Sequence, residues 1–265
     1  MIIKPKKIVV MGACGTWGQE FTKQLVEQGH EVIGVDRDEK TTADYVRKFP
    51  EAKMIISDHG DFKLDGMGVD VLVFLSAYKH INLIEENMPD AIHNNVTKTA
   101  KLLENAHKNN VKVLYVSTDK AVAPYSVYGF TKAIAERLTW FYGGAVARSG
   151  NIAGSNGSVV HVFREQVRNN QPLTVTDMGM ERYFIKIEDA VRLSWAGFLA
   201  GNRLTLVDIG GKVKLGDIIN NVLAEFGHNI DTYQPGIKII GLRADVERLS
   251  DDITWSFDNK YLEKK

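Results

Sequence analysis

The feature that most constrains the fold is a regular alternation, over the first 150 residues, of short apolar runs with longer amphipathic segments. The two strongest runs, residues 69–76 and 111–117, are apolar at almost every position, which is typical of strands covered on both faces. Alternating strands and helices form a parallel sheet with helices on both sides, so the sequence predicts a doubly wound α/β fold. The expected strands are residues 8–11, 31–35, 69–76, 111–117 and 144–148, and the expected helices are 19–28, 90–109 and 128–142.

The second half of the chain is less regular, and we expect it to form a smaller lobe. Residues 151–157 are polar and contain glycine, which predicts a loop, whereas 173–176 and 203–209 predict strands. Residues 215–226 predict a helix that ends at Gly227. We therefore predict a first domain over residues 1–150, to which 185–210 return, and a small C-terminal lobe over 151–184 and 211–265.

Charge and composition exclude several classes of protein. The 33 basic and 33 acidic residues cancel, so no overall field would gather nucleic acid or an anionic membrane. The one cysteine, Cys14, cannot form an internal disulfide, which favours a reducing compartment. No apolar run approaches the ~20 residues of a membrane span, and the N-terminal run is too short for a signal peptide. Because the seven histidines show no metal-ligand spacing, we expect a cytoplasmic protein with no metal centre, no nucleic acid and no membrane partner.

A glycine-rich turn lies between the first expected strand and the first expected helix. It reads Gly-Ala-Cys-Gly-Thr-Trp-Gly, so Gly12, Gly15 and Gly18 are spaced by three. Glycines at this place permit a tight turn and let a pyrophosphate approach backbone N–H groups at the helix N-terminus. The spacing differs from the usual G-x-G-x-x-G, and a plain turn is the alternative. We predict a Rossmann-type dinucleotide site here, with Thr16 and Trp17 among its contacts.

Charged residues after the second and third apolar segments bear on which dinucleotide binds. Asp36 would accept hydrogen bonds from the adenosine ribose diol and repel a 2′-phosphate, which favours NAD. Its neighbour Arg37 would instead pair with that phosphate and favours NADP. The two signals conflict, and we lean to NAD. Asp58 could accept from the adenine amino group, although all three residues could equally be solvated surface charges.

Tyr128 and Lys132 are the first candidates for chemistry. They lie four residues apart at the start of an expected helix and therefore share one face. A lysine ammonium beside a phenol lowers the pKa of the tyrosine, which would let Tyr128 act as a base toward a hydroxyl group. Tyr261 and Lys265 have the same spacing in the charged tail, without such a context. Tyr128 instead follows a buried strand that ends in Ser117–Thr118, whose hydroxyls could bind the same group.

Asp119 and Lys120 follow that strand at its carboxyl end, where loops of open α/β sheets carry ligand chemistry. A β-elimination requires an acid and a base side by side. Lys120 could remove a proton next to a carbonyl while a protonated Asp119 donates to the leaving hydroxyl. Taken alone, this dipeptide is more simply interpreted as an exposed surface pair.

Longer stretches of the chain resemble one enzyme family. The stretch STDKAVAPYSVYGFTKAIAE, residues 117–136, is nearly the family signature, and residues 76–96, 148–166, 172–191 and 241–253 match further segments in order. Together these stretches resemble the extended short-chain dehydrogenase/reductase superfamily. Within it they are similar to the UDP-N-acetylglucosamine 4,6-dehydratases of the polysaccharide-biosynthesis group, including the inverting enzymes of pseudaminic acid synthesis.

The resemblance implies a reaction cycle on a UDP-sugar. Tyr128, assisted by Lys132 and Thr118, would take the proton of the C4 hydroxyl as hydride passes to the cofactor. Lys120 would then remove the C5 proton, Asp119 would protonate the departing C6 hydroxyl, and hydride would return to C6. By the same resemblance, Ser76, Ala77, Lys79 and Asn95 would contact the cofactor, and Lys79, Asn151, Arg182 and Arg243 would hold the nucleotide sugar.

The chain departs from the family pattern at several positions. Ser149 stands where the family has a tyrosine, and residues 245–247 replace its Gly-Glu-Lys. Asp36 replaces the small polar residue of the inverting NADP enzymes, whereas Arg37 agrees with them. These changes bear on the identity of the sugar and of the cofactor more than on the chemistry, because the reactive side chains are all present.

Two other functions stay open from the sequence. A nucleotide-sugar epimerase or reductase on the same scaffold needs only Tyr128, Lys132 and the cofactor. A non-catalytic dinucleotide-binding protein needs only the cofactor site. All three interpretations predict a homo-oligomer in which helices 90–109 and 128–142 pair between copies, although the same helices could be covered within one chain.

Overall fold

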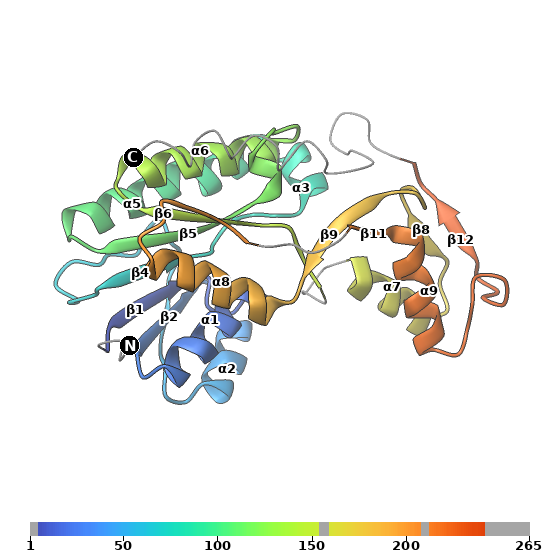
Figure 1. The fold of residues 1–265 in the computed structure, drawn as a ribbon, viewed down its shortest axis with the longest axis horizontal. Coiled ribbons are helices and arrows are strands. Elements are labelled where there is room, and N and C mark those ends of the chain that lie inside the picture. Colours follow the sequence, from blue (N-terminus) through green and yellow to red (C-terminus); the bar gives the residue numbers. More distant parts are fainter. Residues whose placement is uncertain (1–4, 154–158, 208–211, 242–265) are drawn as a thin grey trace.

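The computed structural model describes residues 5–153, 159–207 and 212–241, and its largest element is a parallel sheet (Figure 1). Seven strands follow the order β10-β6-β5-β4-β1-β2-β3. The chain starts near the middle of the sheet and builds outward in both directions, which is the doubly wound Rossmann-type arrangement. The predicted fold class is therefore confirmed. The strands are β1 (Lys7–Met11), β2 (Glu31–Asp36), β3 (Lys53–Ile56), β4 (Val71–Phe74), β5 (Lys112–Thr118), β6 (Ala145–Ser149) and β10 (Leu204–Leu206).

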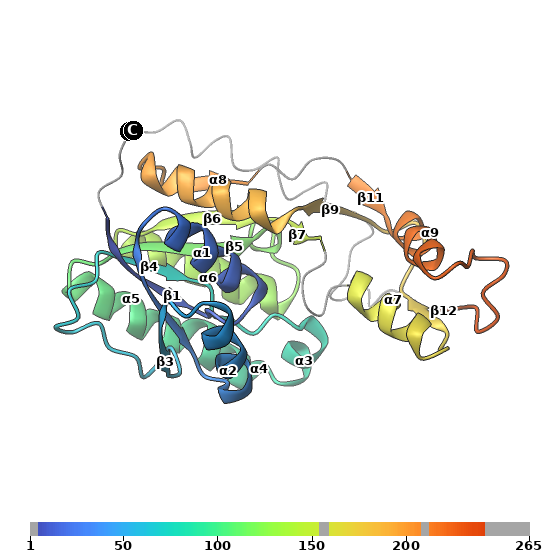
Figure 2. The ribbon, with the colours of Figure 1, turned by 90° about the horizontal axis from the view of Figure 1, so that it is seen from below.

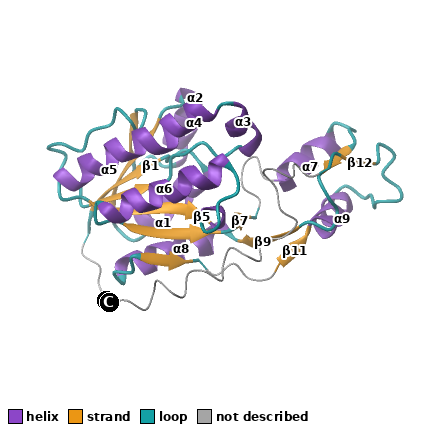
Figure 3. Ribbon diagram, turned by 90° about the horizontal axis from the view of Figure 1, so that it is seen from above, coloured by secondary structure: helices purple, strands orange, loops and turns teal. Residues whose placement is uncertain are grey.

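Helices cover both faces of this sheet, which explains why its strands show little polar alternation. In β1, Ile8 and Val10 pack in a core with α1, α2 and α8, whereas Val9 and Met11 pack in a core with α5 and α6. Figures 2 and 3 show these two helical layers from opposite sides of the sheet. The covering helices are α1 (Thr16–Glu27), α2 (Glu39–Lys48), α8 (Ile187–Leu199), α5 (Thr99–Lys108) and α6 (Val127–Phe141).

The helix expected over residues 90–109 is divided. α4 (Met88–Ile92), which follows the short α3 (Ile81–Glu86), leads into a π-helical turn at His93–Lys98, and the turn leads into α5. Asn94 and Asn95 lie in this turn and are 3% and 1% exposed. A π turn shifts the helical register by about one residue, so it aims side chains inward that an uninterrupted α-helix would place elsewhere. Apolar periodicity does not report such a turn, which is why the sequence predicted one helix.

The smaller lobe has its own core between two helices and two small sheets. β10 returns the chain to the large sheet beside β6, and the predicted division into domains stays a prediction. The loop expected from residue 151 is wrong at its start, because β7 pairs with β9 there; residues 154–158 of that loop lie outside the described residues. The lobe contains α7 (Val159–Arg168), α9 (Leu215–Glu225), β7 (Asn151–Ile152), β8 (Leu173–Val175), β9 (Glu181–Ile185), β11 (Lys212–Lys214) and β12 (Ile237–Ile239).

Candidate active site

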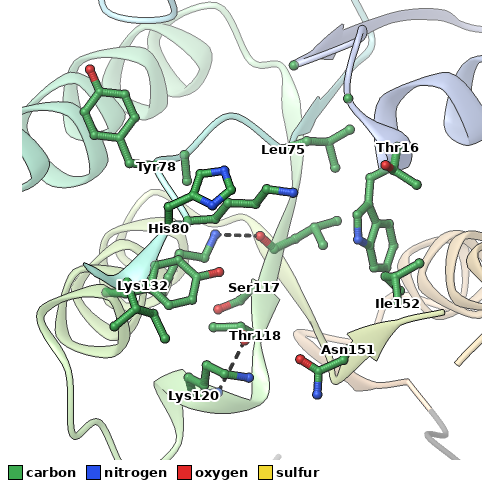
Figure 4. Close-up of a pocket in the computed structure, with 18 of the residues that line it drawn as sticks. Thr16, Leu75, Tyr78, His80, Ser117, Thr118, Lys120, Lys132, Asn151 and Ile152 are labelled. Carbon is green, nitrogen blue, oxygen red and sulfur yellow. Dashed lines mark hydrogen bonds between the residues drawn. The ribbon is translucent and has the colours of Figure 1, made fainter. Parts of the chain in front are cut away.

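A cavity of about 750 Å³ lies at the carboxyl ends of the sheet strands, where the smaller lobe faces the sheet. Ligands of open α/β sheets bind at this edge. Figure 4 shows the part of the cavity around β5 and α6. Of the residues predicted from the sequence, those that line the cavity are Gly12, Gly15, Thr16, Trp17, Gly18, Asp36, Arg37, Asp58, Ser76, Ala77, Lys79, Thr118, Lys120, Tyr128, Lys132, Asn151 and Arg182.

The glycine turn after β1 forms a cradle at one end of the cavity. Gly12 has a φ of +87°, and a β-carbon there would come within 2.9 Å of the Ser76 hydroxyl oxygen. A β-carbon at Gly18 would overlap the carbonyl oxygen of Gly12, so the turn and α1 touch directly. Gly15 is the N-cap of α1, and no side chain caps the helix there. The backbone of the helix N-terminus therefore faces the cavity, which is the geometry that binds phosphate.

Asp36, at the end of β2, is held by backbone donors on both of its carboxylate oxygens. The N–H of Cys14 donates to Oδ2 at 3.1 Å, and the N–H of Arg37 donates to Oδ1 at 2.8 Å. Because Cys14 belongs to the glycine turn, the carboxylate is fixed beside the phosphate cradle. A ribose bound next to that cradle would contact the Asp36 carboxylate.

Arg37 and Asp58 form a charged cluster across the ends of β2 and β3. Arg37 Nη1 lies 3.3 Å from Asp58 Oδ2, and the Arg37 guanidinium lies 5.1 Å from the ring centre of Tyr78. Lys98 Nζ donates to the same Asp58 oxygen at 3.1 Å, and the N–H of Gly60 donates to Oδ1 at 2.8 Å. Burial raises the pKa of Asp58, but the hydrogen bonds and the neighbouring charges lower it overall. One carboxylate therefore serves two cations, and the cluster keeps a net positive charge.

Asn95, predicted to contact the cofactor, lies behind the cavity wall. Its side chain accepts from the Tyr78 N–H at 2.8 Å and donates to the Tyr78 carbonyl at 3.0 Å. It also donates to Thr131 Oγ1 at 3.2 Å. The structure thus corrects the expected contact: Asn95 ties the loop after β4 to α6. Lys79, on that loop, does line the cavity, and burial lowers the pKa of its ammonium.

Lys132 is buried against β5. It is 3% exposed, and its Nζ donates to the carbonyl of Val116 at 2.8 Å, the upper dashed line in Figure 4. The same Nζ lies 4.1 Å from the ring centre of Tyr115. Burial lowers the pKa of Lys132 to about 7, although the Glu136 carboxylate one turn further along α6 opposes this shift. Lys132 therefore loses its proton much more readily than an ordinary lysine.

Tyr128 lies one turn before Lys132, at the start of α6. Ser126 begins the helix here, because its Oγ accepts the N–H of Gly129 at 3.2 Å. Burial raises the pKa of Tyr128, while the charge of Lys120 and a hydrogen bond with Thr118 oppose the shift. The expected lowering of the Tyr128 pKa by Lys132 is therefore wrong for the protein's own groups. Lys132 is turned toward β5, and Lys120 is the lysine whose charge acts on the phenol.

Asp119 and Lys120 do not form an exposed surface pair. Asp119 is 0% exposed, and its Oδ1 accepts from Thr118 Oγ1 at 2.7 Å and from Lys120 Nζ at 3.0 Å. Asp119 Oδ2 has no hydrogen-bond partner among the described residues. The Lys120 side chain is 25% exposed and lines the cavity, whereas Asp119 lies directly behind the wall. The interpretation of this dipeptide as an exposed surface pair is therefore wrong.

Two of the residues expected to hold the sugar, Asn151 and Arg182, lie on the side of the smaller lobe, whereas Lys79 lies on the loop after β4. Asn151 Nδ2 donates to the Tyr183 carbonyl at 3.2 Å, and Arg182 Nη1 donates to the Glu181 carbonyl at 2.7 Å. Arg243 lies outside the described residues. Sequence reasoning did not single out the apolar lining of this side, because such residues read as ordinary core: Ile152, Val159, Met180, Phe184, Val213, Leu215 and Ile218.

Sequence reasoning also missed His59 and Asn94, which are buried in the cavity wall. His59 Nε2 hydrogen-bonds the Asn94 carbonyl at 3.0 Å. The Asn94 amide donates to Asn95 Oδ1 at 3.0 Å, which fixes its orientation. Its own Oδ1 then has no hydrogen-bond partner in the described part of the chain. Only the π-helical turn, which spacing does not reveal, aims Asn94 at the cavity.

The cavity fits a dinucleotide. The glycine cradle offers backbone N–H groups to a pyrophosphate, and Asp36 offers a fixed carboxylate to a ribose. Ser117 Oγ and Asn94 Oδ1 are buried polar atoms in its wall without partners among the described residues. No group of His, Cys, Asp and Glu within residues 5–153, 159–207 and 212–241 could hold a metal ion.

The chain is similar to known proteins over most of its length. It is 31% identical to the probable polysaccharide biosynthesis protein EpsC of Bacillus subtilis, over 91% of this chain and 44% of that protein. It is 29% identical to the inverting UDP-N-acetylglucosamine 4,6-dehydratase of Campylobacter jejuni, over 97% of this chain and 82% of that protein. It is also 31% identical to a UDP-glucose 4-epimerase of Rickettsia canadensis, over 75% of this chain and 64% of that protein.

Solved structures share the fold. The dTDP-glucose 4,6-dehydratase DesIV of Streptomyces venezuelae, solved with NAD and TYD bound, superposes with a TM-score of 0.79 at 21% identity, over 92% of this chain and 87% of that one. The model of the family described as polysaccharide biosynthesis protein matches residues 8–264. The chain therefore belongs to this family of polysaccharide biosynthesis proteins, within the extended short-chain dehydrogenase/reductase superfamily.

Proposed function

We propose that the chain is a nucleotide-sugar 4,6-dehydratase that acts on UDP-N-acetylglucosamine or a close relative. The observation that carries the proposal is the meeting of Tyr128, Thr118 and Lys120 at one wall of a cavity whose other end is a phosphate cradle. Behind this wall the Asp119 carboxylate accepts from both Thr118 and Lys120. A base for a hydroxyl group and an acid–base pair for an elimination thus lie within one site.

Each of these side chains has a task in the proposed reaction. A bound nicotinamide dinucleotide would accept hydride from C4 of the sugar and return it to C6. Tyr128 acts as the phenolate, which the charge of Lys120 favours, and takes the proton of the C4 hydroxyl. Lys120 first passes its ammonium proton to Asp119 across their 3.0 Å contact, which leaves a neutral amine beside a carboxylic acid. The Lys120 amine then takes the C5 proton, which the C4 ketone acidifies, and the C6 hydroxyl leaves as water with the proton from Asp119. Because Asp119 does not line the cavity, this last step requires its carboxyl to turn inward or to act through the Thr118 hydroxyl.

In the proposed reaction the cofactor binds at the glycine turn, and we propose that this cofactor is NAD. Asp36 is aligned by two backbone N–H groups for a ribose diol and would repel a 2′-phosphate. The competing residue, Arg37, is held by Asp58 and stacks near Tyr78, which weakens the case for a phosphate partner. Gly12, Gly15 and Gly18 with the start of α1 would hold the pyrophosphate.

The alternative is a nucleotide-sugar epimerase, which one relative's name favours. The first experiment is mass spectrometry of the protein incubated with NAD and UDP-N-acetylglucosamine. We expect a product lighter by one water, and Lys120→Ala should abolish it. Lys101→Ala, on the exposed side of α5, is the matched control and should keep it. An unchanged mass would reject dehydration of this sugar and leave two cases, epimerisation or a different nucleotide sugar. A new anomeric signal in the proton NMR spectrum, formed equally well by Lys120→Ala, would then establish epimerisation.

We also propose a cytoplasmic homo-oligomer. Phe130, Ile134 and Phe141 recur on one side of α6 and are 52%, 48% and 78% exposed. Met88 and Ile92 of α4, at 44% and 47%, add to the exposed apolar surface of the same helical layer. Apolar area of this kind is typical of surfaces that other chains cover. Among the described residues, no helix is long and apolar enough to cross a bilayer.

A further inference from the structure

The hydroxyl of Ser117 is buried in the cavity wall with its hydrogen-bonding capacity unused. Ser117 is 6% exposed, and its Oγ has no hydrogen-bond partner among the residues that the structure describes. Native structures pair most buried polar side-chain atoms, because an unpaired one loses its hydration without compensation. An unpaired hydroxyl that lines a binding cavity therefore indicates a missing partner.

The neighbours of Ser117 on β5 are already engaged. The Val116 carbonyl accepts from Lys132 Nζ at 2.8 Å (Figure 4), and Thr118 Oγ1 donates to Asp119 at 2.7 Å. Ser117 itself pairs with Arg148 of β6 in the register of the sheet. The register therefore fixes the backbone of Ser117 between the two strand positions that support the proposed reactive groups.

We infer that the Ser117 hydroxyl hydrogen-bonds the nicotinamide half of the bound dinucleotide, at a hydroxyl or carboxamide group. This inference rests on the proposed function. The strands lie side by side in the order β1, β4, β5, so Ser117 is about two interstrand spacings, ~10 Å, from the glycine turn after β1. A dinucleotide with its pyrophosphate at Gly12 would cross Ser76 at the end of β4 and bring its other half to Ser117.

Ser117→Ala tests the inference through two effects that differ in sign. In calorimetric titrations, the variant should bind NAD about three- to tenfold more weakly, the loss expected for one neutral hydrogen bond. Without nucleotide, it should melt at an unchanged or higher temperature, because the substitution removes a buried hydroxyl that has no partner. A structural role for Ser117 predicts the opposite: a lower melting temperature and unchanged affinity.

Ser194→Ala is the matched control. Ser194 is 0% exposed in α8, and its Oγ donates to the Ala190 carbonyl at 2.7 Å, outside the cavity lining. This variant should melt at a lower temperature and bind NAD as the unchanged protein does.

The outcomes separate the inference from the proposal beneath it. Equal NAD affinity of Ser117→Ala and the unchanged protein would overturn the inference alone. The same is true if Ser117→Ala weakens only the binding of UDP-N-acetylglucosamine, since the hydroxyl would then belong to the sugar. If the unchanged protein binds neither NAD nor NADP, the proposed function fails, and the inference fails with it.

Discussion

The two ends of the cavity hold their charges in different ways. At the end formed by β2 and β3, Asp36 accepts two backbone N–H groups, and Asp58 accepts from Gly60, Lys98 and Arg37. At the end formed by β5 and α6, the ammonium of Lys132 contacts neutral groups, the Val116 carbonyl and the Tyr115 ring. The first end lowers the pKa of the Asp58 carboxyl and so favours its charged form, whereas the second lowers the pKa of Lys132 and so disfavours its charged form.

The two pKa shifts suit two different functions, ligand recognition and acid–base chemistry. A carboxylate with a lowered pKa, such as Asp58, stays charged over the physiological range and suits recognition. A group with a pKa near neutrality exchanges its proton easily and suits acid–base chemistry. Lys132, with a pKa of about 7, is of the second kind. The comparison supports the proposal that the β2–β3 end binds the cofactor and that the β5–α6 end moves protons.

Tyr128→Phe breaks the reactive end and should have the largest effect. It removes the proposed base, so we expect the initial rate of water loss to fall by ~10²–10⁴-fold, the usual contribution of a positioned acid or base. NAD should still bind, because the other end is untouched. Tyr233→Phe is the control: its hydroxyl donates to the Gln171 carbonyl in the smaller lobe, outside the cavity lining, and the rate should persist. A fast Tyr128→Phe enzyme would remove Tyr128 from the mechanism.

Asp36→Asn sharpens the comparison at the binding end, with a smaller effect. The amide keeps the shape and one acceptor oxygen but loses the charge that repels a 2′-phosphate. We expect the ratio of NAD to NADP affinity to fall by about 10–100-fold, or ~1.4–2.7 kcal/mol. The measurement is a pair of titrations, with Asp44→Asn on the exposed surface of α2 as the control. An unchanged ratio would mean that Asp36 does not face the ribose.

Those parts of the fold and site that depend on local sequence could be predicted. A few consecutive residues are enough to recognise the buried runs of β4 and β5 and the glycine turn after β1. Tyr128 and Lys132 could be paired by spacing alone, because a helix fixes which positions share a face. The buried strands and the tight turn were confirmed, since covered parallel strands and tight turns restrict composition strongly.

The remaining features depend on contacts between distant segments. The burial of Asp119 requires Thr118 and Lys120 to close over it, which no dipeptide reveals. The π-helical turn that aims Asn94 inward depends on packing against α6 and the loop after β4. The direction in which the pKa of Tyr128 moves was also mispredicted, because spacing to Lys132 says nothing about where that ammonium points.

Lys132→Met tests the comparison most finely, through the stability of the protein without nucleotide. The folded chain holds the pKa of Lys132 at about 7, against 10.5 for an ordinary lysine. Between these values the unfolded chain binds a proton that the folded chain does not, so this group makes the free energy of unfolding rise with pH, by up to ~1.4 kcal/mol per pH unit.

Lys132→Met removes that contribution. Urea unfolding over a series of pH values should therefore show that the free energy of unfolding of the unchanged protein rises relative to that of the variant as the pH rises above about 7. Lys101→Met, at an exposed position of α5, should run parallel to the unchanged protein. If Lys132→Met also runs parallel, Lys132 stays charged in the folded chain throughout, and the reactive end holds its cation as firmly as the other end holds its carboxylates.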